Sequence, residues 1–190
     1  MKRIVIFASG GGTNAERIIQ YFKGSTDISV AALFTDKPQC RAAAIASSYK
    51  VPVISFTSDE LINGTVLKEL KKTKPDLVVL AGFLKLLPSE MIKLYKNKIV
   101  NIHPALLPKY GGKGFYGKYV HEAVLNSGDK QTGITIHLVD EEYDRGEILL
   151  QKQCEVLPCD TPVILAERVR RLEHQYYPVT IENLLKKGGT

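Results

Sequence analysis

The sequence predicts an α/β fold: a mostly parallel, twisted sheet with helices on both faces and an antiparallel strand near the C-terminal end. Short, continuously apolar segments alternate with segments of helical periodicity in the first half, which is typical of a parallel sheet covered on both faces. In the second half, residues 140–146 join two strand-like segments without helical spacing, which favours an antiparallel pair. Because no linker, repeat or low-complexity segment interrupts the chain, we expect residues 1–190 to form one domain.

The elements of the first half follow from apolar runs and helical spacing. The apolar runs predict strands over residues 4–8, 29–34, 53–55 and 77–80. Helical spacing predicts helices over residues 15–22, 41–48 and 66–72. Pro88 indicates the start of a further helix, because proline is favoured in a first helical turn.

The second half begins with a strand over residues 99–103. A helix over residues 121–126 and strands over 132–138 and 148–156 are expected to follow. Thr161 and Pro162 are typical of a helix cap and first position, so the last helix begins there and extends to about Lys187. We expect Pro178 to kink or break this helix.

Composition limits the classes of partner. The formal net charge of +6 and the pI near 9.1 favour anionic ligands. The basic residues are scattered without an aromatic-interleaved motif, so nucleic acid is not an expected partner. No apolar run approaches membrane-spanning length. Cys40, Cys154 and Cys159 lack metal-ligand spacing, so we expect free thiols in the cytoplasm and no bound metal.

Two polar residues lie near the carboxyl end of the strand over residues 99–103. Side chains two apart in a strand share a face, so Asn101 and His103 lie side by side, and Pro104 ends the strand. Ligands of open α/β sheets bind at this edge. An amide beside an imidazole suits a reaction that builds negative charge on a carbonyl oxygen. The alternative is a polar strand end with a structural histidine.

A glycine-rich loop, residues 9–14, follows the first strand. Its glycines allow backbone amides to approach an anion, and the following helix N-terminus favours negative charge. Thr13 and Asn14 add side-chain donors that suit a terminal phosphate. The alternative for this loop is a nucleotide-binding module, which would use Gly10, Gly12, Ala15 and Asp36.

Two later loops are rich in charge. Residues 109–118 contain four glycines and three lysines, which predicts a mobile loop near an anionic site. Residues 140–146 contain four carboxylates. One of them could turn toward an imidazole, raise its pKa and hold its orientation, but the residues alone do not say which.

The remaining candidate functional residues are two histidines and one face of the last helix. We expect His137 to be a partly buried structural histidine and His121 to have a packing or surface role. Four polar or charged side chains share one face of the last helix, at spacings of three, four and seven residues. The default interpretation of this face is an ion pair within the helix, exposed to water. These residues are Arg170, Glu173, His174 and Tyr177.

The order of these segments resembles that of the phosphoribosylglycinamide formyltransferases, within the folate-dependent formyltransferase superfamily. The resemblance covers essentially the whole chain and rests on residues 9–14, 81–87, 101–110, 144–146 and 173–174. It implies a Rossmann-like formyltransferase fold and a role in purine biosynthesis. It also implies transfer of formyl from 10-formyltetrahydrofolate, a co-substrate, to the amine of 5′-phosphoribosylglycinamide by direct attack. The expected partners are small molecules, and the expected state is a monomer or weak homodimer.

The resemblance also implies roles for individual residues. Asn101 and His103 would stabilise the oxyanion on the formyl oxygen, while Asp144 would orient and charge His103 and assist proton transfer from the amine. The remaining assignments divide between two substrates. The phosphate and ribose would contact Gly11, Gly12, Thr13, Asn14, Arg170 and Glu173. The folate would contact Leu84, Lys85, Leu86, Leu87, Asp140 and Glu141, and more generally the loop that ends at Asp144.

Departures from the family pattern concern three places. The segment between Tyr110 and His121 is longer, Lys85 stands where arginine is common, and Asp36 replaces an expected asparagine. The alternatives within the superfamily are formyltetrahydrofolate hydrolase and the aminosugar or tRNA formyltransferases. The hydrolase and the tRNA enzyme normally carry a second domain. A sequence of 190 residues therefore favours the phosphoribosylglycinamide formyltransferases over these two enzymes.

Overall fold

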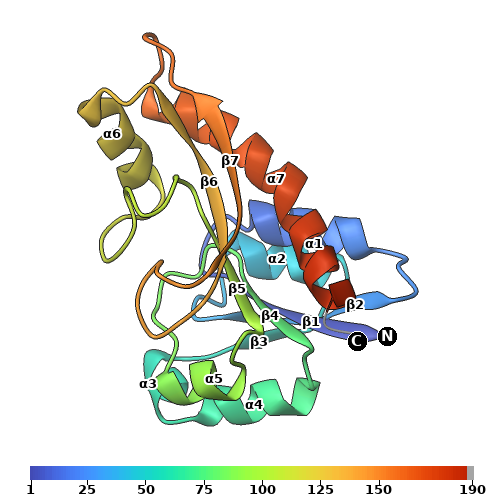
Figure 1. Cartoon of the computed structure of the whole chain (residues 1–190). Helices are drawn as coiled ribbons and strands as arrows, with labels where there is room; N and C mark the ends of the chain where they lie inside the picture. Colours follow the sequence, from blue (N-terminus) through green and yellow to red (C-terminus); the bar gives the residue numbers. More distant parts are fainter. Residues whose placement is uncertain (188–190) are drawn as a thin grey trace.

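The computed structural model describes residues 1–187, in which a central sheet is covered by helices on both faces (Figure 1). The sheet has seven strands in the order β3-β2-β1-β4-β5-β6-β7. The strands are β1 (Lys2–Phe7), β2 (Ile28–Thr35), β3 (Val53–Ser55), β4 (Leu77–Leu80), β5 (Ile99–His103), β6 (Gln131–Leu138) and β7 (Ile148–Glu155).

One strand, β6, runs opposite to all the other strands of this sheet. The strands from β3 to β5 pair in parallel, whereas β6 is antiparallel to both β5 and β7. The predicted fold, including the antiparallel strands near the C-terminal end, is therefore confirmed. The chain order reverses between β1 and β4, and ligands of open α/β sheets bind at the carboxyl ends of strands at such a switch point.

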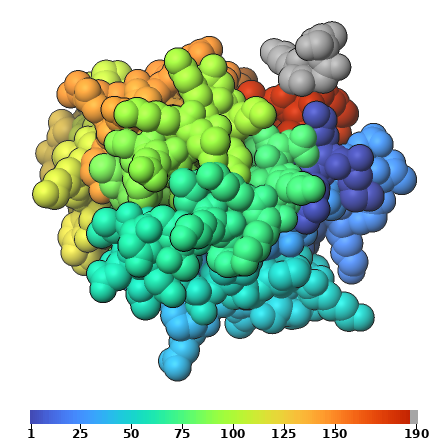
Figure 2. Space-filling view, turned by 90° about the horizontal axis from the view of Figure 1, so that it is seen from below, coloured from blue at the N-terminus to red at the C-terminus, as the bar shows by residue number. Residues whose placement is uncertain are grey.

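Two sets of helices form the outer layers. The helices are α1 (Thr13–Phe22), α2 (Arg41–Ser48), α3 (Ser58–Ile62), α4 (Thr65–Thr73), α5 (Ser89–Leu94), α6 (Lys118–Ser127) and α7 (Pro162–Lys187). α1, α2 and α7 cover one face of the sheet, and α3, α4 and α5 lie on the other (Figure 1). Figure 2 shows the molecule from the side of α3–α5. α6 packs against α7 near the antiparallel strands.

Alternation along the strands builds a separate core on each face. In β1, Ile4 and Ile6 pack toward α1 and α7, whereas Val5 and Phe7 pack toward α4 and α5. All four side chains are fully buried. This is why the parallel strands are continuously apolar in sequence.

The last helix is not broken at Pro178, so the break that Pro178 was expected to cause is absent. α7 continues from Pro162 to Lys187 with Pro178 inside it. Proline has no backbone N–H, so the carbonyl of His174, four residues earlier, loses its helical donor. The Arg17 side chain donates a hydrogen bond to this carbonyl at 3.3 Å. A contact from another helix thus satisfies the group that proline leaves unpaired.

Two helices differ from the sequence prediction. α3 was not expected, because its five residues are too few to show periodicity; Thr57 and Glu60 form a capping box at its start. α6 begins at Lys118, three residues before the expected boundary. Within residues 1–187, no helix combines the length and apolarity needed to span a bilayer.

Candidate active site

The carboxyl ends of β4 and β5 open into a cavity of about 480 Å³. Asn101 and His103, on the same side of β5, both line it, as the two-residue strand period predicts. His103 is buried, whereas Asn101 is partly exposed. Asn14, Asp144 and Glu173 reach the same cavity from three other segments.

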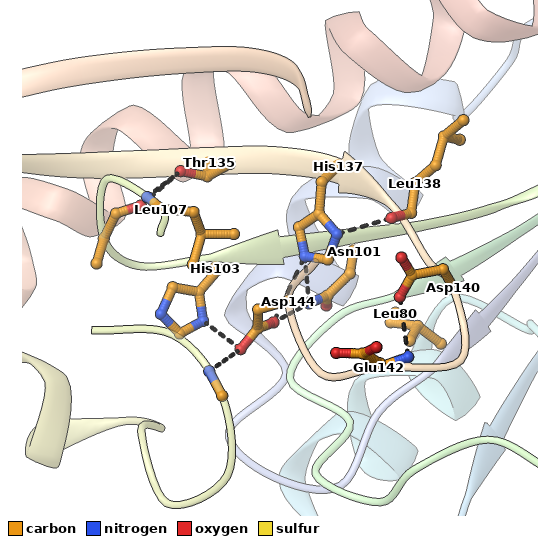
Figure 3. Close-up of polar contacts among 12 residues, drawn as sticks. Leu80, Asn101, His103, Leu107, Thr135, His137, Leu138, Asp140, Glu142 and Asp144 are labelled. Carbon is orange, nitrogen blue, oxygen red and sulfur yellow. Dashed lines mark hydrogen bonds and ion pairs between the residues drawn. The ribbon is translucent and has the colours of Figure 1, made fainter. Parts of the chain in front are cut away.

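Asp144 lies between two imidazoles (Figure 3). Its Oδ2 is 3.5 Å from His103 Nδ1, and its Oδ1 is 3.5 Å from His137 Nε2. The backbone N–H of Gly112 donates to Oδ2 at 2.9 Å. Burial works to raise the pKa of Asp144, but the neighbouring His137 and His103 rings and the Gly112 amide hold it below its usual range. Asp144 is therefore a carboxylate at neutral pH.

His137 fixes the direction of the Asn101 amide. The Leu138 carbonyl lies 2.8 Å from His137 Nδ1 and can only accept a hydrogen bond, so Nδ1 carries the hydrogen. In the neutral ring, Nε2 is then the acceptor. Asn101 Nδ2 donates to it at 3.2 Å and lies 3.5 Å from Asp144 Oδ1 (Figure 3).

The orientation of the His103 ring is fixed by a hydrogen bond from Nε2, the nitrogen that does not face Asp144. Nε2 donates to the Tyr110 carbonyl at 2.6 Å, and Nδ1 is left facing Asp144. Burial lowers the pKa of His103, while the Asp144 charge and the Tyr110 carbonyl work to raise it; the net pKa lies below the usual value. The ring is thus neutral at neutral pH, and a second proton would be taken up on Nδ1.

The glycine-rich loop packs closely against α2. Gly12, at φ +72°, precedes the first residue of α1, and a Cβ there would lie 2.6 Å from the Ala42 Cα. Glycine is therefore required by the backbone at this position. In the first turn of α1, Asn14 Nδ2 donates a hydrogen bond to Glu173 Oε2 at 2.9 Å. Burial raises the pKa of Glu173, although Asn14 and the nearby Arg170 work to lower it.

One wall of the cavity comes from the segment after β4. Leu84, Lys85, Leu86 and Leu87 all line it. Leu84 and Leu86 are 49% and 45% exposed, which leaves apolar surface available to a ligand. Lys85 Nζ donates to Ser58 Oγ at 2.7 Å and lies 3.6 Å from Asp36 Oδ2. Two of the three departures from the family pattern, Lys85 and Asp36, thus form an ion pair.

Several predicted site residues do not line this cavity. Asp140 accepts a hydrogen bond from the Glu142 backbone, and Glu141 lies 3.8 Å from Lys93; neither residue is among those that line the cavity. Arg170 lines a neighbouring cavity of about 550 Å³ between α6 and α7, to which Glu173 also contributes. Residues 11–13 lie next to Asn14 but do not line either cavity.

The sequence interpretation missed the contribution of His137. It is only 2% exposed and lies 3.2 Å from Asn101 Nδ2 and 3.5 Å from Asp144 Oδ1. β6 pairs with β5 so that His137 lies opposite Asn101. The sequence shows that polar and apolar residues alternate along β6, with the apolar residues at even-numbered positions from Ile134 to Leu138. It does not show the register of β6 against β5. Among the described residues, no group of three or more potential ligands is placed to bind a metal ion.

Comparison with known proteins identifies the family. Residues 2–181 match the model of the formyl transferase family. The chain belongs to this family. Its solved members include phosphoribosylglycinamide formyltransferase from Bacillus halodurans, with 38% identity, a TM-score of 0.89 and coverage of 98% of this chain and 97% of the other.

Relatives in the family differ in length. Phosphoribosylglycinamide formyltransferase from Bacillus subtilis is 35% identical over 97% of this chain and 95% of its own length. The chloroplastic phosphoribosylglycinamide formyltransferase of Arabidopsis thaliana is 45% identical over 93% of this chain. This chain covers only 63% of the length of that plant relative.

Proposed function

We propose that this protein transfers the formyl group of 10-formyltetrahydrofolate to the amine of 5′-phosphoribosylglycinamide. The observation that carries the proposal is the arrangement of Asn101, His103 and Asp144 around one cavity. The names and extensive similarity of the bacterial relatives support the choice of substrates. Folate is the co-substrate of this reaction and leaves as tetrahydrofolate.

The chemistry requires stabilisation of a tetrahedral intermediate. The amine nitrogen bonds to the formyl carbon, and the carbonyl electron pair moves onto the oxygen. An N–H of Asn101 would hold this oxyanion, and so would the Nδ1–H of His103 once that nitrogen is protonated, because both groups reach the cavity. The bond from carbon to N10 of the folate then breaks. One proton leaves the amine and one proton reaches N10, so the reaction needs a proton carrier but no oxidant or reductant.

Asp144 and His103 are suited to carry this proton. Asp144 is an acceptor within 3.5 Å of His103 Nδ1, the one ring nitrogen that is free to gain a proton. A negative charge developing beside the imidazole raises its proton affinity. His103 would therefore become an imidazolium as the intermediate forms, and Asp144 would stabilise that charge. The neutral ring of the ligand-free protein is the starting state for this step.

Two further regions would bind the non-reacting parts of the substrates. Leu84 to Leu87 supply an apolar wall for the folate ring. The loop over residues 11–14 would bind the phosphate at the N-terminus of α1, and Glu173 would accept hydrogen bonds from the ribose hydroxyls. Arg170, one helical turn before Glu173, adds positive charge on α7.

The proposal also covers the cellular location and the oligomeric state of the protein. We expect it to act in the cytoplasm as a monomer or weak homodimer, without nucleic acid. Its free cysteines, Cys40, Cys154 and Cys159, fit a reducing compartment. Light scattering over a range of protein concentrations would measure the oligomeric state.

An absorbance assay for folate release tests the proposal. We expect release from 10-formyltetrahydrofolate only when 5′-phosphoribosylglycinamide is also present. Release that does not depend on the amine would instead identify a hydrolase. Absence of release, together with binding of a dinucleotide, would favour the nucleotide-binding alternative.

A further inference from the structure

The segment that follows the active-site strand holds both members of the His103–Asp144 pair through its backbone. The Tyr110 carbonyl accepts from His103 Nε2 at 2.6 Å, and the Gly112 N–H donates to Asp144 Oδ2 at 2.9 Å. Two backbone groups, two residues apart, thus set the positions of the imidazole and the carboxylate. Any shift of this segment would move both.

The backbone between these two contacts is packed tightly. A Cβ at Gly111 would lie 2.5 Å from Leu107 Cδ2 and 3.4 Å from the Asp144 Cβ, so there is no free space for a side chain at this position. Tyr110 itself has φ +56°, in the left-handed region that a bulky residue seldom adopts. A conformation of this kind persists only where the surroundings impose it.

The Tyr110 side chain supplies that restraint from outside the cavity. Its hydroxyl lies 2.8 Å from Asp129 Oδ2 and 2.5 Å from Ser127 Oγ. Asp129 follows the end of α6 and precedes β6, the strand that carries His137. Lys109 contacts the same carboxylate at 3.0 Å. The loop after β5 is therefore fastened to the start of the neighbouring strand.

We propose that Tyr110 and Asp129 are a positioning pair, which fixes the Tyr110 backbone so that its carbonyl orients the catalytic imidazole of His103. Neither side chain lines the main cavity, so the pair acts through His103 and not on a substrate. Asp144, His137 and His121 are the titratable side chains whose charge is coupled to His103. None of them contacts the Tyr110 hydroxyl, whose partners are Ser127 and Asp129.

The variant Tyr110→Phe tests this proposal, because it keeps the ring and removes the hydroxyl. Tyr21→Phe is the matched control, since the Tyr21 hydroxyl also donates to a surface carboxylate, Glu182, at 2.6 Å. We expect Tyr110→Phe to lower kcat by about 10- to 100-fold with little change in either KM, because the imidazole is misplaced. The control should retain the parental kcat. Asp129→Asn should resemble Tyr110→Phe, and combining the two changes should add little.

The pH dependence separates positioning from general destabilisation. The Tyr110 carbonyl works to raise the pKa of His103, so loosening this contact should move the His103 limb of the kcat profile to lower pH. An unchanged limb and kcat, with only a lower Tm, would overturn the proposal. A loss that appears only in one KM would overturn it as well, because it would indicate direct substrate contact.

A measurement without substrate keeps this inference separate from the proposed function on which its kinetic readout rests. Histidine ¹⁵N and ¹³C NMR of the ligand-free protein reports the tautomer and pKa of each of its four histidines. His103→Gln identifies the relevant signals. We expect Tyr110→Phe to lower the His103 pKa and weaken the Nε2–H tautomer, whether or not formyl transfer is observed. Signals identical to those of the parent protein would refute the positioning pair.

Discussion

The Asn14 amide and the Glu173 carboxylate form a 2.9 Å hydrogen bond across 159 positions of the sequence. This bond joins the first turn of α1 to α7 at the edge of the cavity. It brings a carboxylate acceptor next to the helix N-terminus where the proposed phosphate-binding loop lies. In the proposed reaction, this region would take the phosphate and the ribose hydroxyl groups of 5′-phosphoribosylglycinamide.

Glu173→Gln should weaken binding of the ribonucleotide and leave the folate unaffected. A hydrogen bond to a charged acceptor contributes about 1.5–3 kcal/mol, so we expect KM for 5′-phosphoribosylglycinamide to rise by about 10- to 100-fold. KM for 10-formyltetrahydrofolate should remain near the parental value. Glu182→Gln is the control, because Glu182 lies on the same helix and pairs with Tyr21 and Lys186 at the surface. Equal changes in both KM values would argue against this role.

Asn101→Ala should reduce turnover far more than binding. Loss of one oxyanion donor costs about 100- to 1000-fold in kcat, and His103→Ala should have an effect of similar size. Steady-state kinetics with both substrates saturating would measure this effect. Asn126→Ala, at an exposed position of α6, is the control and should keep the parental kcat. A loss of less than about tenfold in Asn101→Ala would contradict a role in stabilising the oxyanion.

His137 should act through Asn101. His137→Phe removes the acceptor that holds Asn101 Nδ2 at 3.2 Å, so we expect kcat to fall by about 10- to 100-fold. His137→Gln can still accept a hydrogen bond and should recover part of the loss. In the Asn101→Ala background, His137→Phe should cost much less, because contacting residues are not additive. Full additivity of the two changes would show that His137 has a separate function.

His121 should make stability depend on pH. Its ring is 5% exposed and its Nδ1 has no hydrogen-bond partner within the described residues. Burial, followed by the charges of Arg170 and His103, lowers the His121 pKa to about 4. Below pH 6.5, His121 takes up a proton in the unfolded chain but stays neutral in the folded protein. The free energy of unfolding therefore falls as the pH is lowered from 6.5 to about 4.

The expected loss over this range is about 3 kcal/mol from His121 alone. Urea unfolding at several pH values measures it as a slope in the free energy of unfolding. His121→Gln removes the titrating ring, so the slope should become shallower, even if the variant is less stable overall. An unchanged slope would mean that His121 does not titrate in this way.

The elements that were predictable from the sequence are those determined by neighbouring residues. The apolar runs of β1 and β4, the turn at Pro104, and the shared face of Asn101 and His103 all follow from local patterns. The inward position of Asp144, by contrast, came from the family resemblance. Four carboxylates share its loop, and no local rule distinguishes Asp144 from Asp140.

The features that were not predictable depend on contacts between distant segments. The role of His137 requires the register of β6 against β5. At Pro178, the His174 carbonyl that loses its helical donor pairs with Arg17 of another helix. The helical spacing alone favoured an ion pair in water for the face that carries Glu173, whereas Glu173 accepts a hydrogen bond from Asn14 at the cavity. In each case the deciding partner lies far away in the sequence.

The central claim, formyl transfer to an amine held in this cavity, is tested most directly by following a ¹³C-labelled formyl group. The protein would be incubated with ¹³C-10-formyltetrahydrofolate and 5′-phosphoribosylglycinamide, and the products would be analysed by mass spectrometry. We predict that the label appears in the N-formyl derivative of the ribonucleotide, in equal amount to the tetrahydrofolate released, and that Asn101→Ala suppresses both. Recovery of the label as formate, at a rate independent of the ribonucleotide, would contradict the account.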